Sequence, residues 1–202
     1  MPRPKEHLRS SIVRIQGKSR GTGFWIKGKD GQTYILTCAH VAGEQGNQVE
    51  VWFHNSANQF HIKDKAAVLA EVFISIPEQD GDLALLVLPP ETIPGDILPL
   101  QLLDTPFQDP PRFIAYGFPK AASDHGRFAE GGNQVGDLIQ SNYTLPLLQL
   151  REAEEVRRGF SGGPLVHADL GYALGMISDL EAPDDDSNAS IPYAIPARFI
   201  AE

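Results

Sequence analysis

Short apolar segments recur along the whole chain of 202 residues, and helical periodicity is nearly absent. Residues that favour turns, chiefly glycine, proline and aspartate, separate these segments. Short runs with this spacing are typical of the strands of β-barrels and β-sandwiches. The predicted strands cover residues 11–15, 21–26, 33–37, 49–53, 67–74 and 82–88, and then 112–119, 137–141, 147–150, 165–167, 172–178 and 191–195. The sequence therefore predicts an all-β protein.

The segment 91–110 divides the predicted strands into two sets of six. It is rich in proline and has little periodicity, which is typical of a linker. We therefore expect two six-stranded antiparallel β-barrels, formed by residues 11–90 and 111–202. A short C-terminal helix over 196–202 is expected, because proline suits the first turn of a helix.

Composition excludes several classes of partner. The net charge of -9 disfavours nucleic acid and anionic membranes, since both need clustered lysine and arginine. The longest apolar run, residues 83–88, is far shorter than the roughly 20 residues of a membrane-spanning helix. The first ten residues lack the apolar core of a secretory signal, and Cys38 is the only cysteine, which fits a reducing compartment. We expect a cytoplasmic protein with neither nucleic acid nor membrane as a partner.

The segment GFSGGPL at residues 159–165 places a single serine, Ser161, among three glycines. Glycine allows backbone conformations that other residues avoid, so N–H groups can converge beside the serine hydroxyl, where an oxyanion could be held. The pattern G-x-S-x-G alone also fits a glycine-rich turn with an incidental serine. A nucleophilic role requires a base to take the serine proton and an acid to hold that base.

His40 and Asp82 are the candidates for base and acid. His40 follows a predicted apolar strand and small neighbours, and Asp82 precedes a continuous apolar strand. Taken singly, each is more typical of a surface or turn residue. Together with Ser161 they form the set that nucleophilic catalysis needs.

The chain order of these residues separates the known hydrolase designs. An α/β-hydrolase needs its acid and its histidine after the serine, but the only later histidine is His167, six residues on. The subtilisin order would need an early acid such as Asp30, which lies in a predicted hairpin turn, and also the helices of an α/β fold. What remains is the order histidine, aspartate, serine on an all-β chain.

On these motifs the chain resembles the trypsin-like serine peptidases of the chymotrypsin fold. The matching segments are GTG at 21–23, TCAH at 37–40, DLALL at 82–86, GFSGGPL at 159–165 and GMIS at 175–178. The resemblance implies that His40 is the general base, Asp82 its orienting acid and Ser161 the nucleophile. It also implies an oxyanion hole made by the N–H groups of Gly159 and Ser161, in a site between the two barrels.

The same resemblance implies a place for the substrate. Ser178, Asp179 and Leu180 match the edge strand on which the family lays an extended peptide. Glu155 matches the position of the acid at the base of the primary pocket, which would favour arginine or lysine in the substrate.

Alternatives for that pocket stay open. The acidic residues at 152–155 also fit a solvated loop, and Asp179 could replace Glu155 as the pocket acid. Arg157 and Arg158 could instead favour acidic substrates.

Departures from the family pattern indicate which members of the family this chain resembles most. Phe160 stands where secreted members carry an aspartate that pairs with a newly cut amino terminus, so activation by such cleavage is not expected. Val41 replaces a cysteine, and all disulfides are missing. In these respects, and in YAIP at 193–196, the chain looks like the bacterial and organellar members such as the HtrA proteases. An HtrA protein carries a further domain after this region, so a regulatory domain following this chain is a partner to expect.

The resulting expectation is a serine endopeptidase that forms an acyl-enzyme with protein or peptide substrates and needs no cofactor and no metal. It would act alone or as the protease domain of a larger regulatory or defence protein. The alternative is a catalytically silent or conditionally active module that binds an extended peptide or a partner domain. Retention of His40, Asp82, Ser161 and Gly159 favours the enzyme.

Overall fold

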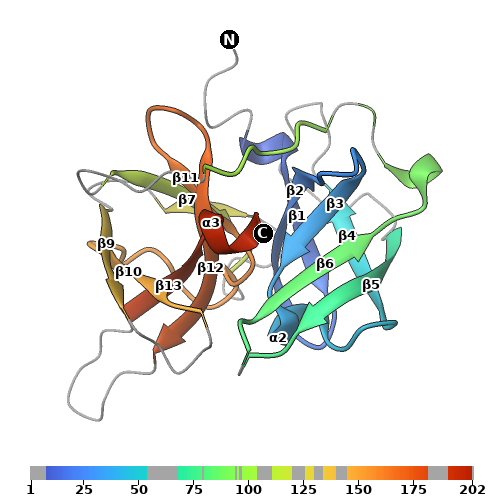
Figure 1. The fold of residues 1–202 in the computed structure, drawn as a ribbon, viewed down its shortest axis with the longest axis horizontal. Helices are drawn as coiled ribbons and strands as arrows, with labels where there is room; N and C mark the ends of the chain where they lie inside the picture. The colour runs from blue at the N-terminus through green and yellow to red at the C-terminus, as the bar shows by residue number, and fades with distance from the viewer. Residues whose placement is uncertain are drawn as a thin grey trace.

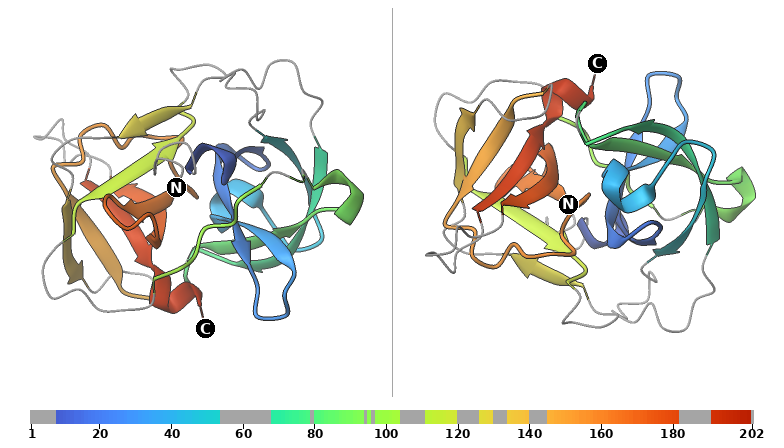
Figure 2. Two further views of the ribbon diagram at one scale, coloured as in Figure 1. Left: turned by 90° about the horizontal axis from the view of Figure 1, so that it is seen from above. Right: turned by 90° about the horizontal axis from the view of Figure 1, so that it is seen from below.

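The computed structural model describes residues 8–53, 68–78, 80–93, 95, 97–103, 111–119, 126–129, 134–139, 145–181 and 191–201. Two groups of antiparallel strands lie side by side in every view (Figures 1 and 2). The expectation of an all-β protein with two lobes is confirmed.

The first lobe is a closed six-stranded barrel with the strand order β1-β2-β3-β6-β5-β4. Its strands are β1 (Ile12–Gln16), β2 (Arg20–Lys27), β3 (Thr33–Thr37), β4 (Gln48–Phe53), β5 (Val68–Ile76) and β6 (Leu83–Val87). Ile35, Leu86 and Val72 are aligned across β3, β6 and β5, and all three are fully buried. This row of branched apolar side chains on neighbouring strands forms part of the barrel core.

The second lobe is a seven-stranded sheet with the order β8-β7-β11-β12-β13-β10-β9. Its strands are β7 (Phe113–Gly117), β8 (Arg127–Ala129), β9 (Gln134–Ile139), β10 (Leu147–Arg151), β11 (Pro164–His167), β12 (Ala173–Glu181) and β13 (Ile191–Pro196). The sequence predicted a second six-stranded barrel here, whereas the described strands form a sheet of seven. The additional strand is β8, whose three residues are too few to show a periodicity, so its pairing with β7 becomes visible only in the fold.

Helices are few and short among the described residues. The single turn α3 (Ala197–Ile200) follows Pro196, which agrees with the expected C-terminal helix (Figure 1). The turn α2 (Ala39–Ala42) and the 3-10 turn η2 (Pro90–Thr92) were not predicted. None of the described helices has the length and apolar character needed to span a membrane.

An apolar core continues across the boundary between the lobes. One cluster of buried side chains combines the first barrel with residues of the second lobe, including Tyr116, Phe118, Met176 and Ile195. A second cluster lies within the second lobe and contains Phe160. The two lobes are therefore held together by the same kind of packing that fills each of them.

The segment 97–103 runs between the lobes and bonds to both. The N–H of Leu100 donates to the carbonyl of Trp25 in β2 (2.8 Å), and the N–H of Leu103 donates to the carbonyl of Ala173 in β12 (2.8 Å). The predicted linker thus contributes backbone hydrogen bonds on both sides of the boundary.

Leu100 and Leu98 provide a matched test of this segment, because Leu100 is 3% exposed and Leu98 is 42% exposed. We expect Leu100→Ala to lower the free energy of unfolding by about 2–4 kcal/mol, since it leaves a cavity in the core. Leu98→Ala should cost less than about 1 kcal/mol. Chemical denaturation followed by tryptophan fluorescence measures both, and equal losses would contradict the assigned packing.

Candidate active site

His40 lies where β3 leaves the barrel core. The strand ends at the buried Thr37, and Cys38, in an extended conformation, precedes the single turn α2. Val41, the next residue after His40, is fully buried and packs this turn against the apolar core. The His40 side chain remains 27% exposed, so the fold fixes the backbone of the residue while leaving its ring accessible.

Asp82 is held at the start of β6 by an unusual backbone. Its φ is 53°, and the carbonyl of Pro77 accepts hydrogen bonds from the N–H groups of Asp80, Gly81 and Asp82 at 2.9, 2.9 and 3.0 Å. Aspartate is one of the few non-glycine residues that tolerate a positive φ. This loop turns the Asp82 side chain into the protein, where it is fully buried.

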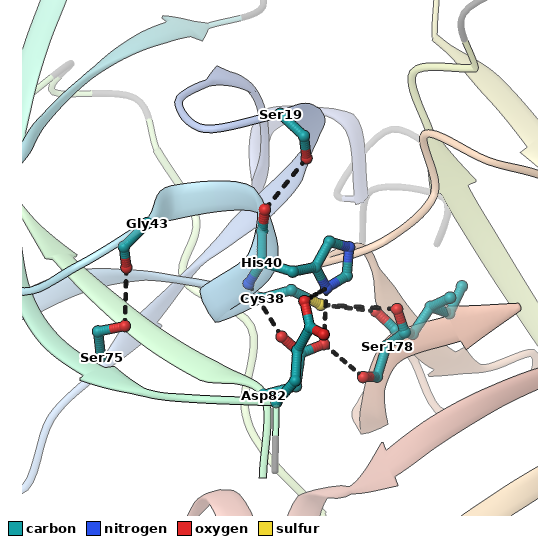
Figure 3. Close-up of polar contacts among 9 residues, drawn as sticks. Ser19, Cys38, His40, Gly43, Ser75, Asp82 and Ser178 are labelled. Atoms are coloured by element: carbon teal, nitrogen blue, oxygen red, sulfur yellow. Dashed lines mark hydrogen bonds and ion pairs between the residues drawn. The ribbon is translucent and has the colours of Figure 1, made fainter. Parts of the chain in front are cut away.

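His40 and Asp82 form two hydrogen bonds (Figure 3). His40 Nδ1 lies 2.8 Å from Asp82 Oδ2, and the backbone N–H of His40 donates to Asp82 Oδ1 at 3.0 Å. Because a carboxylate can only accept, Nδ1 carries the proton in the neutral imidazole. Nε2 is then the basic nitrogen, and it lies on the side of the ring away from Asp82.

Ser178 completes the surroundings of Asp82. Its hydroxyl donates to Asp82 Oδ2 at 2.6 Å, and the residue itself is fully buried (Figure 3). The sequence predicted only a substrate-binding role for Ser178, so this contact was missed. The available signal was the position of Ser178 directly after the apolar run Gly175-Met176-Ile177. That position predicts a buried residue, and a buried hydroxyl needs a hydrogen-bond partner.

The turn that carries Ser161 is docked on the first lobe by backbone contacts. The N–H of Thr22 donates to the carbonyl of Ser161 at 2.9 Å. A Cβ on Gly162, whose φ is 83°, would lie 2.3 Å from Thr37 Oγ1 and 2.0 Å from the Thr22 carbonyl. Only glycine permits this close approach, which sets the serine beside the segment that leads into His40.

Gly159 has a conformation that requires glycine. Its φ is 107°, and a Cβ there would lie 2.4 Å from the carbonyl oxygen of Phe118. The N–H of Phe160 donates to the carbonyl of Arg157 at 3.0 Å, so residues 157–160 have the pattern of a type II turn. Thr22 Oγ1 donates to the Gly159 carbonyl at 2.7 Å, which directs that oxygen into the first lobe.

Two N–H groups of this segment, those of Gly159 and Ser161, point to a role outside the backbone hydrogen bonds. Within the described part of the chain, neither the Gly159 nor the Ser161 N–H donates a hydrogen bond to a backbone carbonyl. Phe160 lies between them and is 1% exposed, packed in the core of the second lobe. Its ring leaves no room for a Cβ on Gly117, which would lie 2.6 Å from the ring. Apolar packing therefore fixes the residue between the two N–H groups.

Cys38 lies on the buried side of the His40–Asp82 pair. Its Sγ is 3.4 Å from the carbonyl oxygen of Ile177, and the residue is fully buried. Burial, which is the larger cause, and the negative charge of Asp82 raise the pKa of the Cys38 thiol well above its ordinary value. The thiol therefore stays protonated at neutral pH and does not act as a nucleophile.

The other predicted site residues lie farther along the second lobe. Glu155 is exposed, two residues after the buried Ala153, and its pocket role stays a prediction. Asp179 and Leu180 belong to β12, with Leu180 opposite Pro192 of β13. Asp30, the acid that the subtilisin order would have needed, lies in the first lobe, in the turn after β2, where it accepts a hydrogen bond from Tyr34 Oη at 2.6 Å.

The bond from Ser178 to Asp82 generates a stability test. Ser178→Ala leaves a buried carboxylate short of one donor, so we expect the free energy of unfolding to fall by about 1.5–3 kcal/mol. Ser75→Ala is the control, because Ser75 Oγ donates to the neutral carbonyl of Gly43 at 2.7 Å. Its loss should be about 0.5–1.5 kcal/mol. A smaller effect at Ser178 than at Ser75, measured by denaturation at pH 7, would contradict the assigned bond.

Comparison with solved structures places this fold among proteases. A crystal structure of Rv3671c from M. tuberculosis H37Rv has a TM-score of 0.64 and 26% identity, and the match covers 98% of this chain and 86% of that one. The active form of the Rv3671c protease gives a TM-score of 0.66 at 24% identity, with coverage of 98% and 81%. The HtrA-type protease AlgW, solved with a tripeptide, gives 0.69 at 18% identity, and this chain spans 60% of it.

Sequence comparison identifies the family. A search of curated proteins found no match. The family model described as "Trypsin-like peptidase domain" matches residues 21–176, which include His40, Asp82 and Ser161. The chain therefore belongs to the trypsin-like peptidase family, and it is a serine peptidase.

Proposed function

We propose that this chain is an endopeptidase that cleaves peptide bonds through an acyl-enzyme, with His40, Asp82 and Ser161 as its triad. The observation that carries the proposal is the bond of 2.8 Å between His40 Nδ1 and the fully buried Asp82 carboxylate. It fixes the tautomer in which Nε2 is basic, as a general base for a serine requires.

The proposed reaction has two halves. Ser161 Oγ attacks the substrate carbonyl while His40 Nε2 accepts its proton, and His40 then returns this proton to the leaving amine. Water enters the second half, again activated by His40, and releases the acyl group from Ser161. Asp82 remains ionised throughout and stabilises the imidazolium.

The N–H groups of Gly159 and Ser161 are the proposed oxyanion hole. Two features support this role: neither group donates to a backbone carbonyl in the described part of the chain, and the Gly159 carbonyl is turned towards Thr22. Donors that are already oriented stabilise the negative charge of the tetrahedral intermediate without further rearrangement.

Residues 178–181 of β12 are the proposed binding strand for substrate. Leu180 and Glu181 pair with β13 on one side, whereas β11 pairs with β12 no farther than Met176. Among the described strands, the other edge of residues 178–181 is therefore open. An extended peptide can add to such an edge through main-chain hydrogen bonds, close to Ser178 and hence to Asp82.

The alternative is a conditionally active module. A solved neighbour, the Rv3671c protease, is described in both an active and an inactive form. We also propose that the domain acts in the cytoplasm within a larger regulatory or defence protein, as expected from the sequence. In either setting the triad would be the same.

Labelling with a fluorophosphonate probe tests the nucleophile. We expect one label per chain, on Ser161, and its loss in Ser161→Ala and in His40→Ala, because the probe reacts only with a serine whose proton can be removed. Ser75→Ala, which removes a hydroxyl elsewhere in the first lobe, should label like the native chain. Peptide mapping by mass spectrometry locates the label. A label on another serine, or one that persists without His40, would refute the assignment.

Asp82→Asn tests the acid. We expect kcat to fall on the order of 10⁴-fold, by analogy with the same substitution in a triad of this kind, because the amide favours the wrong imidazole tautomer. Asparagine also tolerates a positive φ, so the backbone should be kept. Asp80→Asn, at an exposed position in the same loop, is the control and should retain its activity. Steady-state hydrolysis of a casein substrate measures both, and undiminished turnover in Asp82→Asn would remove Asp82 from the mechanism.

A further inference from the structure

The fold brings three different metal-binding side chains together. The Sγ of Cys38, a ring nitrogen of His40 and a carboxylate oxygen of Asp82 all lie within 4.8 Å of one another. Figure 3 shows the sulfur beside the carboxylate and the imidazole. No metal was expected from the sequence, in which Cys38 is the only cysteine. Asp82 is 42 residues from His40, so the three side chains meet only after folding.

A fourth potential ligand lies on the solvent side. Glu78 Oε1 is 4.0 Å from His40 Nδ1, and its side chain is 54% exposed. Cys38 and Asp82 are fully buried, whereas the His40 ring is partly exposed. Glu78 and the His40 ring therefore form the side of the cluster that faces solvent.

The donor set has the chemistry that zinc prefers. Zn²⁺ is bound in proteins by cysteine sulfur, histidine nitrogen and carboxylate oxygen, at about 2.0–2.3 Å in a tetrahedral arrangement. Such bond lengths place neighbouring ligand atoms about 3.3–3.8 Å apart. That range lies between the 2.8 Å of the His40–Asp82 bond and the 4.8 Å limit of the cluster. Modest side-chain movements would therefore bring the three ligand atoms to the separations of a tetrahedral zinc site.

Charge favours the same ion. The buried part of the site, made of a thiolate, a carboxylate and a neutral imidazole, carries two negative charges, which a divalent cation balances. The third carboxylate, Glu78, is 54% exposed, so water solvates its charge. A neutral cluster avoids the cost of an uncompensated charge in a buried site. The Ser178 hydroxyl can keep its bond to Asp82, because a carboxylate oxygen has two lone pairs.

We infer that Cys38, His40 and Asp82, with Glu78 on the solvent side, form an inhibitory site for Zn²⁺. This inference rests on the proposed function, since it concerns the regulation of the same triad. No electron is transferred. Zn²⁺ takes the place of the Cys38 thiol proton, which leaves to solvent, and binds the Nδ1 lone pair of His40 after the ring proton moves to Nε2.

Inhibition follows from that proton movement. An imidazole that is protonated on Nε2 and bound to Zn²⁺ through Nδ1 has no lone pair for the proton of Ser161. The hydrogen bond that orients the base is also replaced by a metal bond. The metal-bound chain should therefore neither react with a fluorophosphonate nor hydrolyse peptides, and a chelator should restore both activities.

Cobalt absorption tests the site without relying on activity. Co²⁺ bound by a thiolate shows a sulfur-to-metal charge-transfer band in the near ultraviolet, and Cys38 is the only cysteine of the chain. We expect this band to saturate at one Co²⁺ per chain, to vanish on addition of Zn²⁺ and to be missing in Cys38→Ala and Cys38→Ser. Failure to observe the band in the native chain would overturn the inference, even if fluorophosphonate labelling had succeeded.

Inhibition by Zn²⁺ provides the second measurement. Each variant is labelled with fluorophosphonate over a series of Zn²⁺ concentrations and compared with its own labelling in a chelator. We expect the half-inhibiting concentration to rise at least about 100-fold in Cys38→Ala and in Cys38→Ser, since loss of a residue that only supports a ligand already costs 10–100-fold.

Glutamate variants complete the test. Glu78→Gln should raise the half-inhibiting concentration about 10-fold, whereas Glu71→Gln, at an exposed position on β5, should leave it unchanged. Equal inhibition of the native chain and both Cys38 variants would overturn the inference in favour of a surface site. A native chain that shows the cobalt band but never labels would refute the proposed function and leave the metal site standing.

Discussion

The buried carboxylate of Asp82 is the point on which the site depends. A charge without exposure to water costs several kcal/mol unless donors compensate it. The donors come from both lobes: His40 contributes two from α2 in the first lobe, and Ser178 contributes one from β12 in the second. Correct association of the lobes is therefore a condition for burying the charge, and the same contacts orient the imidazole.

The turn that carries Ser161 is stabilised by different means. Phe160, which replaces the aspartate of secreted family members, packs in the core of the second lobe rather than forming an ion pair. Gly117 leaves room for the Phe160 ring, and Gly159 and Gly162 permit the close contacts of the same turn with Phe118 and Thr22. Apolar packing rather than an ion pair thus holds the N–H groups beside the serine, which is consistent with the expectation from the sequence that no newly cut amino terminus is needed.

Features that depend on residues close together in the chain could be predicted from the sequence, and features that depend on distant residues could not. Strand positions, the order of His40, Asp82 and Ser161, and the need for glycine at 159 follow from short patterns. The strand β8, the bond from Ser178 to Asp82 and the meeting of Cys38 with the His40–Asp82 pair depend on residues far apart in the chain. Single-sequence patterns carry no information on such pairings.

Thr22 shows how the lobes are coupled at the level of atoms. Its N–H donates to the Ser161 carbonyl, its hydroxyl donates to the Gly159 carbonyl, and its own carbonyl accepts from Thr37 Oγ1. Thr37 is the last residue of β3, three positions before His40. One residue of β2 therefore bonds to the turn that carries Ser161, the proposed nucleophile, and to the strand that leads to His40, the proposed base. A displacement of one lobe relative to the other would strain these bonds together, so the geometry of Ser161 relative to His40 is fixed by the lobe interface itself.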